Sequence, residues 1–328
     1  LYDRETGTEV MMNDPRFLRA PTIFKAFYDG GARVAVVTAK DKLRSLLGHG
    51  LEFSEGRAVC FSSEKSDVAT KAEHGIDNAS AWLGRPVPEV YSAELSEFVF
   101  AAGVKLLKEF RPDVMYLTTT DYVQHKYAPG VPQANAFYAM FDRYLGELDA
   151  LGAAIVVTAD HGMKPKHKAD GSPDVIYVQD LLDHWLGKDA ARVILPITDP
   201  YVVHHGALGS FATAYLPPGA DQAGIMKRFA GIKGIDLVID NATACARFEL
   251  PGDRIGDIVL ISSENKTLGT SEHRHNLAAL NEPLRSHGGL TEQKVPFIVN
   301  RKLPRLPNAP ELRNFDAFHY AAMAAAMG

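Results

Sequence analysis

Five residues of this chain could bind metal ions, and they stand in three separate places. Asp121 and His125 lie in TTTDYVQHK, Asp160 and His161 in VVTADHGM, and His287 in LRSHGGL. Hydrolytic zinc centres use such carboxylate and imidazole ligands, usually with about three protein ligands and one open position per ion. The five residues are too many for one catalytic ion and roughly one or two too few for a complete two-metal site. They predict a metal-dependent hydrolase whose ligand set needs further residues.

The spacing within these motifs sets a condition on local structure. Asp121 and His125 are four residues apart, so a helical turn would place both side chains on one face. Asp160 and His161 are neighbours, which point to opposite faces of a regular strand. They converge only where the strand breaks, and Gly162 allows such a turn. Either motif alone occurs often on protein surfaces without binding a metal. Their combination with a histidine in a glycine turn favours metal binding.

Helical and strand patterns alternate along the first half of the chain. Apolar residues recur at helical spacing in 21–29, 93–110 and 132–151. The short apolar runs ARVAVVTAK, DVMYLTTT and AAIVVTA predict buried strands. This alternation predicts an α/β fold with a mostly parallel sheet, whose ligands bind beyond the carboxyl ends of the strands. The residues that follow strand ends are Lys40 and Lys42, Asp121 with His125, and Asp160 with His161.

The pattern changes after about residue 170. FATAYLP, IDLVID and DIVLISS read as short strands among loops rich in glycine, proline and aspartate. The segments KVPFIVNRKL and RNFDAFHYAAMAAAMG then predict a further core strand and a final helix. We therefore expect a discontinuous core of residues 1–174 and 281–328, with an α+β cap over residues 175–280 inserted into it.

Composition excludes several functional classes. The chain has 328 residues, 46% hydrophobic and 23% charged, which is enough to bury a large core. Its 35 basic and 40 acidic residues are well mixed, unlike the basic surface of a nucleic-acid binder. No apolar stretch approaches the roughly 20 residues of a membrane span. The start, LYDRETGTEV, lacks the pattern of a signal peptide. We expect a cytoplasmic protein whose Cys60 and Cys245 are reduced thiols.

The metal-ligand motifs resemble those of the alkaline phosphatase superfamily of two-metal phosphohydrolases. Within it, the chain is most similar to the phosphonoacetate hydrolases, almost from end to end. The similar segments are RAPTI, VVTAKDKLR, LLGHG, YSAELSEFVFAAG, TTTDYVQHK, ANAFYAMFD, ADHGM, LPITDPYVVHHGALGS, RFELP, DRIGD, PLRSHGG, EQKVP and NRKL. The resemblance implies an alkaline-phosphatase-like core, with a mostly parallel sheet flanked by helices, and the inserted cap.

The resemblance also implies two zinc ions. Asp121, His125 and His287 would hold one ion, and Asp160 with His161 would hold the second. Manganese and iron suit the same ligand types. The family adds an aspartate at the end of its first core strand and a threonine nucleophile, and neither is found in this sequence. We expect both, with that strand, upstream of Leu1, in roughly the first ninety residues of a family member. Thr118, Thr119 and Thr120 are explained by their strand and turn.

The implied reaction is hydrolysis of the carbon–phosphorus bond of phosphonoacetate to acetate and phosphate, through a phosphothreonine intermediate. The leaving group is a carbanion that the neighbouring carboxylate stabilises. Lys40 and Lys42 match the family lysines that bind this carboxylate, where positive charge acts on the charge that develops during reaction. Without the resemblance, a solvated basic turn would be the better interpretation of these two lysines.

Two alternatives stay open. A nucleotide phosphodiesterase of the same superfamily would share all five ligands, but it needs an apolar slot for a base. A catalytically inactive metal-binding fragment would lack the nucleophile. His204 and His205 could line the site, although a hydrogen-bonded structural pair explains them as well. The expected partner is a small anionic phosphonate, with no nucleic acid or membrane, and the commonest symmetry makes a homodimer the expected oligomer.

Overall fold

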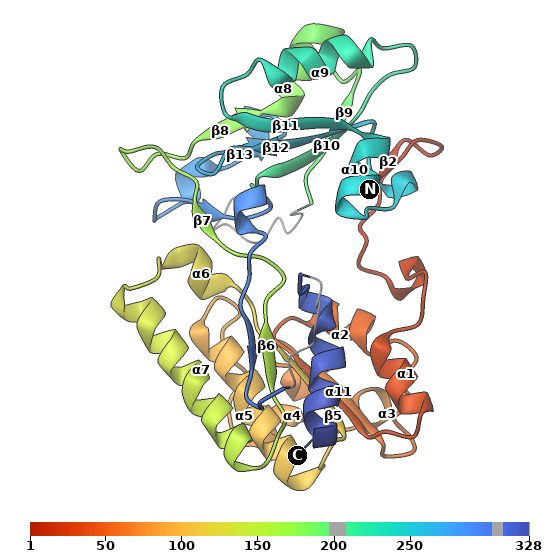
Figure 1. Ribbon diagram of the computed structural model, residues 1–328, viewed down its shortest axis with the longest axis vertical. Coiled ribbons are helices and arrows are strands. Elements are labelled where there is room, and N and C mark those ends of the chain that lie inside the picture. Colours follow the sequence, from red (N-terminus) through yellow and green to blue (C-terminus); the bar gives the residue numbers. More distant parts are fainter. Residues whose placement is uncertain (197–207, 304–310, 328) are drawn as a thin grey trace. The chain divides into compact units, whose positions relative to one another are not determined.

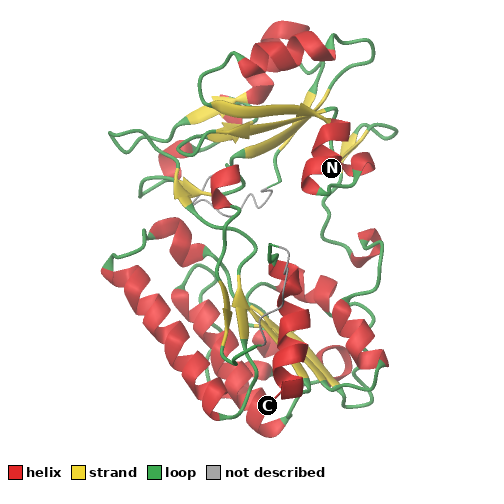
Figure 2. Cartoon of the chain, in the orientation of Figure 1, coloured by secondary structure: helices red, strands yellow, loops and turns green. Residues whose placement is uncertain are grey.

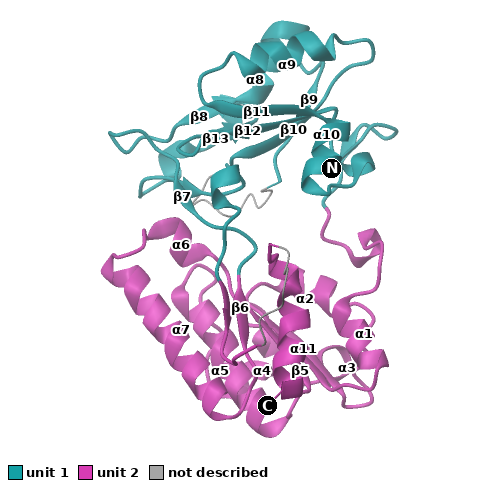
Figure 3. Cartoon of the chain, viewed as in Figure 1, with its two compact units in different colours: residues 1–11, 159–296 teal, residues 12–158, 297–328 magenta. Residues whose placement is uncertain are grey.

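The computed structural model describes residues 1–196, 208–303 and 311–327, which form two compact units (Figure 3). Unit 1 comprises Leu1–Met11 and Ala159–Pro296, and unit 2 comprises Met12–Thr158 and Phe297–Gly328. Both units combine helices with strands, so the expected α/β class is confirmed (Figure 2). His204 and His205 lie outside the described residues.

The expected cap, residues 175–280, lies entirely within unit 1. The expected core of 1–174 and 281–328 is shared between the two units, because residues 1–11, 159–174 and 281–296 cluster with the cap. These compact units show which segments pack together, and they do not show where a cap domain is inserted into the core. The boundaries of the core and of the inserted cap therefore stay a prediction.

Unit 2 contains a parallel sheet of three strands in the order β4-β3-β5. Its elements are α1 (Ile23–Asp29), β3 (Val34–Thr38), α2 (Asp41–Leu47), β4 (Ala58–Ser62), α3 (Lys71–His74), α4 (Ala79–Leu83), α5 (Ala93–Glu109), β5 (Val114–Thr118), α6 (Tyr122–Lys126), α7 (Pro132–Ala150), β6 (Val156–Thr158), β15 (Phe297–Val299) and α11 (Ala317–Met327). The register pairs Thr38 with both Ser62 and Thr118. The carboxyl ends of the three strands are therefore level.

Helices cover both faces of this sheet (Figure 1). Ala35 and Val37 of β3 pack with α4 and α5, whereas Val34 and Val36 pack with α1. This split follows from the alternation of side chains along a strand. The apolar stripe of α7 packs on α5, and Met115 and Leu117 of β5 join the same cluster. The buried, valine-rich β3 is thus held from both sides, which fixes the position of the loop that follows it.

The strands β5 and β6 are less enclosed than β3. All residues of β3 and β4 are buried, but all five residues of β5 are only half-buried. Within the described part of the chain, β5 pairs with β3 alone and β6 pairs antiparallel with β15 alone. An apolar strand with an open edge exposes backbone groups that a further strand could satisfy. The further core strand expected from the resemblance stays a prediction.

Two glycines end helices next to this sheet, and only one of them lies against a strand. Comparing their replacement by alanine tests how tightly the helices pack on the sheet. Gly75 ends α3 at φ 76°, and a Cβ there would lie 2.1 Å from the carbonyl oxygen of Ala58 in β4. Gly84 ends α4 at φ 74°, and a Cβ there would meet nothing within 4 Å. We expect Gly84→Ala to lower the free energy of unfolding by roughly 1–2 kcal/mol, the cost of the left-handed conformation. Gly75→Ala should lower it clearly further, because β4 must move. Denaturant unfolding measures both, and equal losses would contradict the packing.

Unit 1 is built on an antiparallel sheet in the order β11-β12-β10-β9. Its elements are β1 (Tyr2–Asp3), β2 (Thr8–Glu9), β7 (Lys164–Pro165), β8 (Val175–Tyr177), α8 (Val178–Leu186), β9 (Arg192–Ile194), β10 (Phe211–Tyr215), α9 (Gln222–Ala230), β11 (Ile235–Asp240), α10 (Asn241–Phe248), β12 (Ile258–Ser262), β13 (Thr267–Gly269) and β14 (Arg285–Ser286). Helices α8 and α9 cover one face of the sheet, and α10 packs on the other. In the described ranges, no helix has both the length and the apolar character needed to cross a bilayer.

Candidate metal centre and substrate site

Asp121 and His125 lie together in unit 2, at the end of strand β5. Asp121 is the residue before the short helix α6, and His125 lies one turn along it. The Oδ2 atom of Asp121 and the Nε2 atom of His125 are 3.0 Å apart. The His125 side chain is 1% exposed, whereas that of Asp121 is 38% exposed. The expected helical turn is confirmed, and it brings two ligand atoms close enough to bind the same ion at about 2.0–2.2 Å.

Lys40 lies beyond the neighbouring strand end. Strand β3 ends at Thr38, next to Thr118 of β5, and the amide of Ala39 donates to the carbonyl oxygen of Thr118 at 2.9 Å. The Nζ atom of Lys40 lies 5.0 Å from the ring centroid of Tyr91, a cation–π contact. The Tyr91 ring is in turn 6.1 Å from the ring of Tyr122, the residue after Asp121. Aromatic side chains therefore connect Lys40 to the helix that carries His125.

Lys42 occupies a different environment from Lys40. Lys40 is half-buried and precedes α2, whereas Lys42 lies in the first turn of that helix and is exposed. The two lysines thus follow the same strand, as expected, but they are not equivalent. Lys40 has the more defined position, and Tyr91, which helps to define it, did not stand out in the sequence because a single tyrosine after a loop carries no pattern.

Asp160 and His161 lie in unit 1, just beyond the end of β6 at Thr158. The backbone amide of His161 donates to Oδ1 of Asp160 at 3.1 Å, and the Nε2 atom of His161 is 3.6 Å from Oδ2 of Asp160. The strand break confirms the expectation that these neighbours can converge. The reason for Gly162 is different from the expected one. Its φ is not positive, but a Cβ there would lie 3.2 Å from the carbonyl oxygen of Glu292. Close approach of backbone, not the turn itself, favours glycine.

His287 lies beside His161 in unit 1. The two rings stack with centroids 3.5 Å apart and planes 7° from parallel. The short strands β7 and β14 pair antiparallel, which aligns the segments that carry the two histidines. Gly288 has φ 97°, so the expected glycine turn is confirmed there. The structure therefore brings His287 beside His161, although more than a hundred residues separate the two in the sequence.

The ligand types and geometry of these residues fit metal binding. The Nδ1 atom of His161 lies 2.9 Å from the carbonyl oxygen of Gly162. A proton on Nδ1 places the ring lone pair on Nε2, which is the usual way in which a second hydrogen bond prepares a histidine ligand.

An apolar cavity of about 240 Å³ lies beside Asp160 and His161 in unit 1. Its apolar walls come from the α10 face of the antiparallel sheet and from the loops next to it. These apolar residues are Phe211, Phe248, Leu250, Ile261 and Leu290. The sequence did not indicate this cavity, because its walls come from segments that are adjacent only in the folded unit.

A family model and several solved structures are similar to this chain. Residues 1–290 match the family model of type I phosphodiesterase / nucleotide pyrophosphatase. Crystal structures of phosphonoacetate hydrolase from Sinorhizobium meliloti 1021, in complex with phosphonoformate and with phosphonoacetate, are 84% identical with a TM-score of 0.96, and the match covers 99% of this chain and 79% of that one. Murine ectonucleotide pyrophosphatase / phosphodiesterase 5 is 16% identical with a TM-score of 0.54, covering 91% of this chain and 69% of that one. The murine protein shares the fold.

Proposed function

The chain belongs to the type I phosphodiesterase / nucleotide pyrophosphatase family, within the group of the phosphonoacetate hydrolases, and from this membership we propose that it hydrolyses phosphonoacetate to acetate and phosphate. The observation that carries the proposal is the 84% identity, over 99% of the chain, to an enzyme crystallised with phosphonoacetate. The chemistry of the residues agrees with it, because metal ligands and cations are the groups that a small dianionic substrate needs.

We propose that two zinc ions serve this reaction. Asp121, His125 and His287 hold one ion, and Asp160 with His161 hold the second. The pairing of Asp121 with His125 in unit 2, and the stack of His161 on His287 in unit 1, support this assignment. Zinc is the first choice for such ligands, and manganese and iron are the alternatives. When bound, the ions neutralise the phosphonate oxygens and lower the pKa of the attacking group.

Lys40 and Lys42 bind the substrate carboxylate in this proposal. Attack at phosphorus forms an oxygen–phosphorus bond and breaks the carbon–phosphorus bond, whose electron pair passes to carbon. The carboxylate delocalises that charge, and a proton completes acetate. Lys40, whose Nζ atom lies over the Tyr91 ring, would stabilise the charge as it grows on the carboxylate. The exposed Lys42 adds positive charge from the first turn of α2.

The group that attacks phosphorus also has to be identified. The family resemblance favours a threonine before Leu1, with water then hydrolysing the phosphothreonine. Within the chain, Thr118 ends β5 and the amide of Thr120 donates to Oγ of Ser96 at 3.4 Å. These contacts support the interpretation of Thr118, Thr119 and Thr120 as parts of the strand and its turn.

The proposal is tested by following phosphonoacetate with ³¹P NMR in the presence of zinc. We would compare the 328-residue chain with the same chain extended by its upstream coding sequence. The proposal expects equal amounts of phosphate and acetate from the extended chain and none from the shorter one. Turnover by the shorter chain would place the nucleophile within it. No turnover by either chain, with zinc bound, would leave the inactive metal-binding protein as the better account.

The apolar cavity beside Asp160 and His161 favours one second candidate function. A phosphodiester with an aryl or nucleoside group could place that group against Phe211 and Phe248. Hydrolysis of a bis(nitrophenyl) phosphate, faster than that of phosphonoacetate at equal concentration, would support this nucleotide phosphodiesterase activity. The cytoplasmic location and the homodimer also stay proposals, and sedimentation velocity tests the homodimer.

A further inference from the structure

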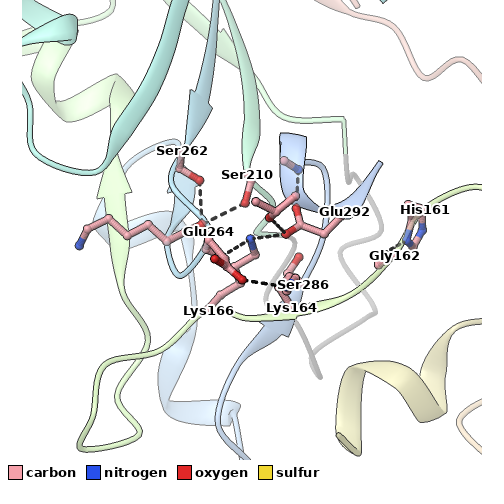
Figure 4. A network of polar contacts seen from close by, with 12 residues as sticks. His161, Gly162, Lys164, Lys166, Ser210, Ser262, Glu264, Ser286 and Glu292 are labelled. Carbon is pink, nitrogen blue, oxygen red and sulfur yellow. Dashed lines mark hydrogen bonds and ion pairs between the residues drawn. The ribbon is translucent and has the colours of Figure 1, made fainter. Parts of the chain in front are cut away.

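Lys166 and Glu292 form a buried ion pair in unit 1 (Figure 4). Their side chains are 0% and 1% exposed, and Nζ of Lys166 lies 3.1 Å from Oε1 of Glu292. The same Nζ donates to the carbonyl oxygen of Glu264 at 2.6 Å. Neither charged residue stood out in the sequence, because a lysine and a glutamate 126 positions apart carry no motif.

Glu292 contacts the backbone of both histidine segments. Its carbonyl oxygen accepts a hydrogen bond from the amide of Gly162, directly after His161, at 2.6 Å. Its Oε2 atom accepts one from the amide of Gly289, two residues after His287, also at 2.6 Å. One residue therefore fixes the two turns whose histidine rings stack.

Both glycines approach this residue closely, Gly162 at its backbone and Gly289 at its carboxylate. A Cβ on Gly162 would lie 3.2 Å from the carbonyl oxygen of Glu292, and a Cβ on Gly289 would lie 2.7 Å from its Oε2. The 2.7 Å distance at Gly289 would force the carboxylate of Glu292 to move, whereas the 3.2 Å distance at Gly162 would require only a small backbone shift. The Gly-Gly pair after His287 is thus matched to the carboxylate of Glu292, and the glycine after His161 to its backbone carbonyl.

A buried ion pair of this kind adds little to stability. Removing two charges from water costs several kcal/mol for each ion, and apolar replacement of a buried pair is often neutral or stabilising by about 1–4 kcal/mol. Burial lowers the pKa of Lys166 below its usual value, and the charge of Glu292 opposes that shift. The Nζ atom of Lys166 contacts Oε1 of Glu292, and Oε2 of the same carboxylate holds the amide of Gly289.

We propose that Glu292, neutralised by Lys166, is a positioning residue that holds the turns after His161 and His287, so that both histidines face the proposed metal site. The inference rests on the proposed metal-binding role of these histidines. Glu292 binds no ion itself. It acts through the backbone of Gly162 and Gly289. Outer partners of metal ligands commonly change metal affinity by about 10–100-fold when they are lost, and that is the range expected here.

Two double variants separate positioning from stability. Lys166→Met with Glu292→Gln removes both charges but keeps an oxygen that can accept from Gly289. Lys166→Met with Glu292→Leu removes both charges and that acceptor. We expect both to fold, because neither leaves an unpaired buried charge. The Gln variant should bind zinc nearly as well as the unchanged chain, and the Leu variant should bind about 10–100-fold more weakly.

The measurements are thermal unfolding of the metal-free proteins, zinc affinity by competition with a chelating dye, and the visible spectrum of the Co²⁺-substituted proteins. An altered cobalt spectrum and weaker zinc binding in the Leu variant alone, at unchanged metal-free stability, would support the inference. Unchanged zinc affinity in a folded Leu variant would overturn it, and so would equal losses in both variants. His161→Ala is measured alongside. If His161→Ala binds zinc normally, the assignment of His161 as a metal ligand is wrong. If zinc affinity falls in His161→Ala but not in the Leu variant, only the positioning role of Glu292 is wrong.

Discussion

Replacing His287 with alanine should abolish most zinc binding and most catalysis. In the proposed site this histidine is one of three ligands of an ion, and its ring also supports that of His161 at 3.5 Å. Loss of an outer partner alone costs about 10–100-fold in metal affinity or activity, so loss of a ligand should exceed about 100-fold. Zinc content after dialysis and phosphate release from phosphonoacetate measure the two effects.

The matched control is His273→Ala. His273 is an exposed histidine of the same unit, in the 3₁₀ turn Glu272–Arg274, and we expect its loss to change neither zinc content nor turnover. Asp160→Asn keeps the size of the side chain and removes its charge, so it should reduce zinc binding while preserving the fold. If His287→Ala kept its full zinc content and activity, the assignment of His287 as a ligand would be wrong.

Replacing Lys40 with methionine should reduce kcat/KM for phosphonoacetate by about 10- to 150-fold, since hydrogen bonds to charged groups contribute about 1.5–3 kcal/mol. Lys42→Met should have a smaller effect, because Lys42 is exposed whereas Lys40 is half-buried against Tyr91. Both kcat and KM should change, because the substrate carboxylate is charged on binding and gains charge during reaction. Steady-state kinetics on the chain with its upstream coding sequence measures these values.

Lys65→Met is the control for this experiment. Lys65 is exposed and follows β4, so it stands beyond the same edge of the parallel sheet as Lys40. We expect normal turnover from this variant. Comparable losses in all three lysine variants would indicate a general effect of surface charge. No loss in the Lys40 variant would remove that residue from the substrate site and weaken the case for phosphonoacetate against a phosphodiester.

The parts of unit 2 that depend on local sequence could be predicted. Helices α5 and α7 and strand β3 correspond to their apolar periodicity, and the four-residue spacing of Asp121 and His125 indicated the helical turn. Strand β4 was missed, because RAVCFS is a short run with no clear alternation. Tyr91 was missed because its contact with Lys40 depends on where α5 begins rather than on a local pattern.

The parts of unit 1 that depend on long-range packing could not be predicted. The sequence identified His161 and His287 as ligands only through separate motifs, and the pairing of β7 with β14 brings them together. The role of Gly162 was wrongly explained by its own conformation, because the atom that it must admit belongs to Glu292. Lys166 and Glu292 were not predicted for the same reason, because the burial of each side chain and the ion pair between them arise only in the folded unit.

The central claim is that five residues, Asp121, His125, Asp160, His161 and His287, hold two metal ions. Anomalous diffraction at the zinc absorption edge, on crystals of the zinc-loaded protein, tests it directly. The account predicts two zinc peaks, one at about 2.0–2.2 Å from ligand atoms of Asp121, His125 and His287 and the other equally close to Asp160 and His161. A single peak bound by other residues, or no peak near His161 and His287, would contradict it.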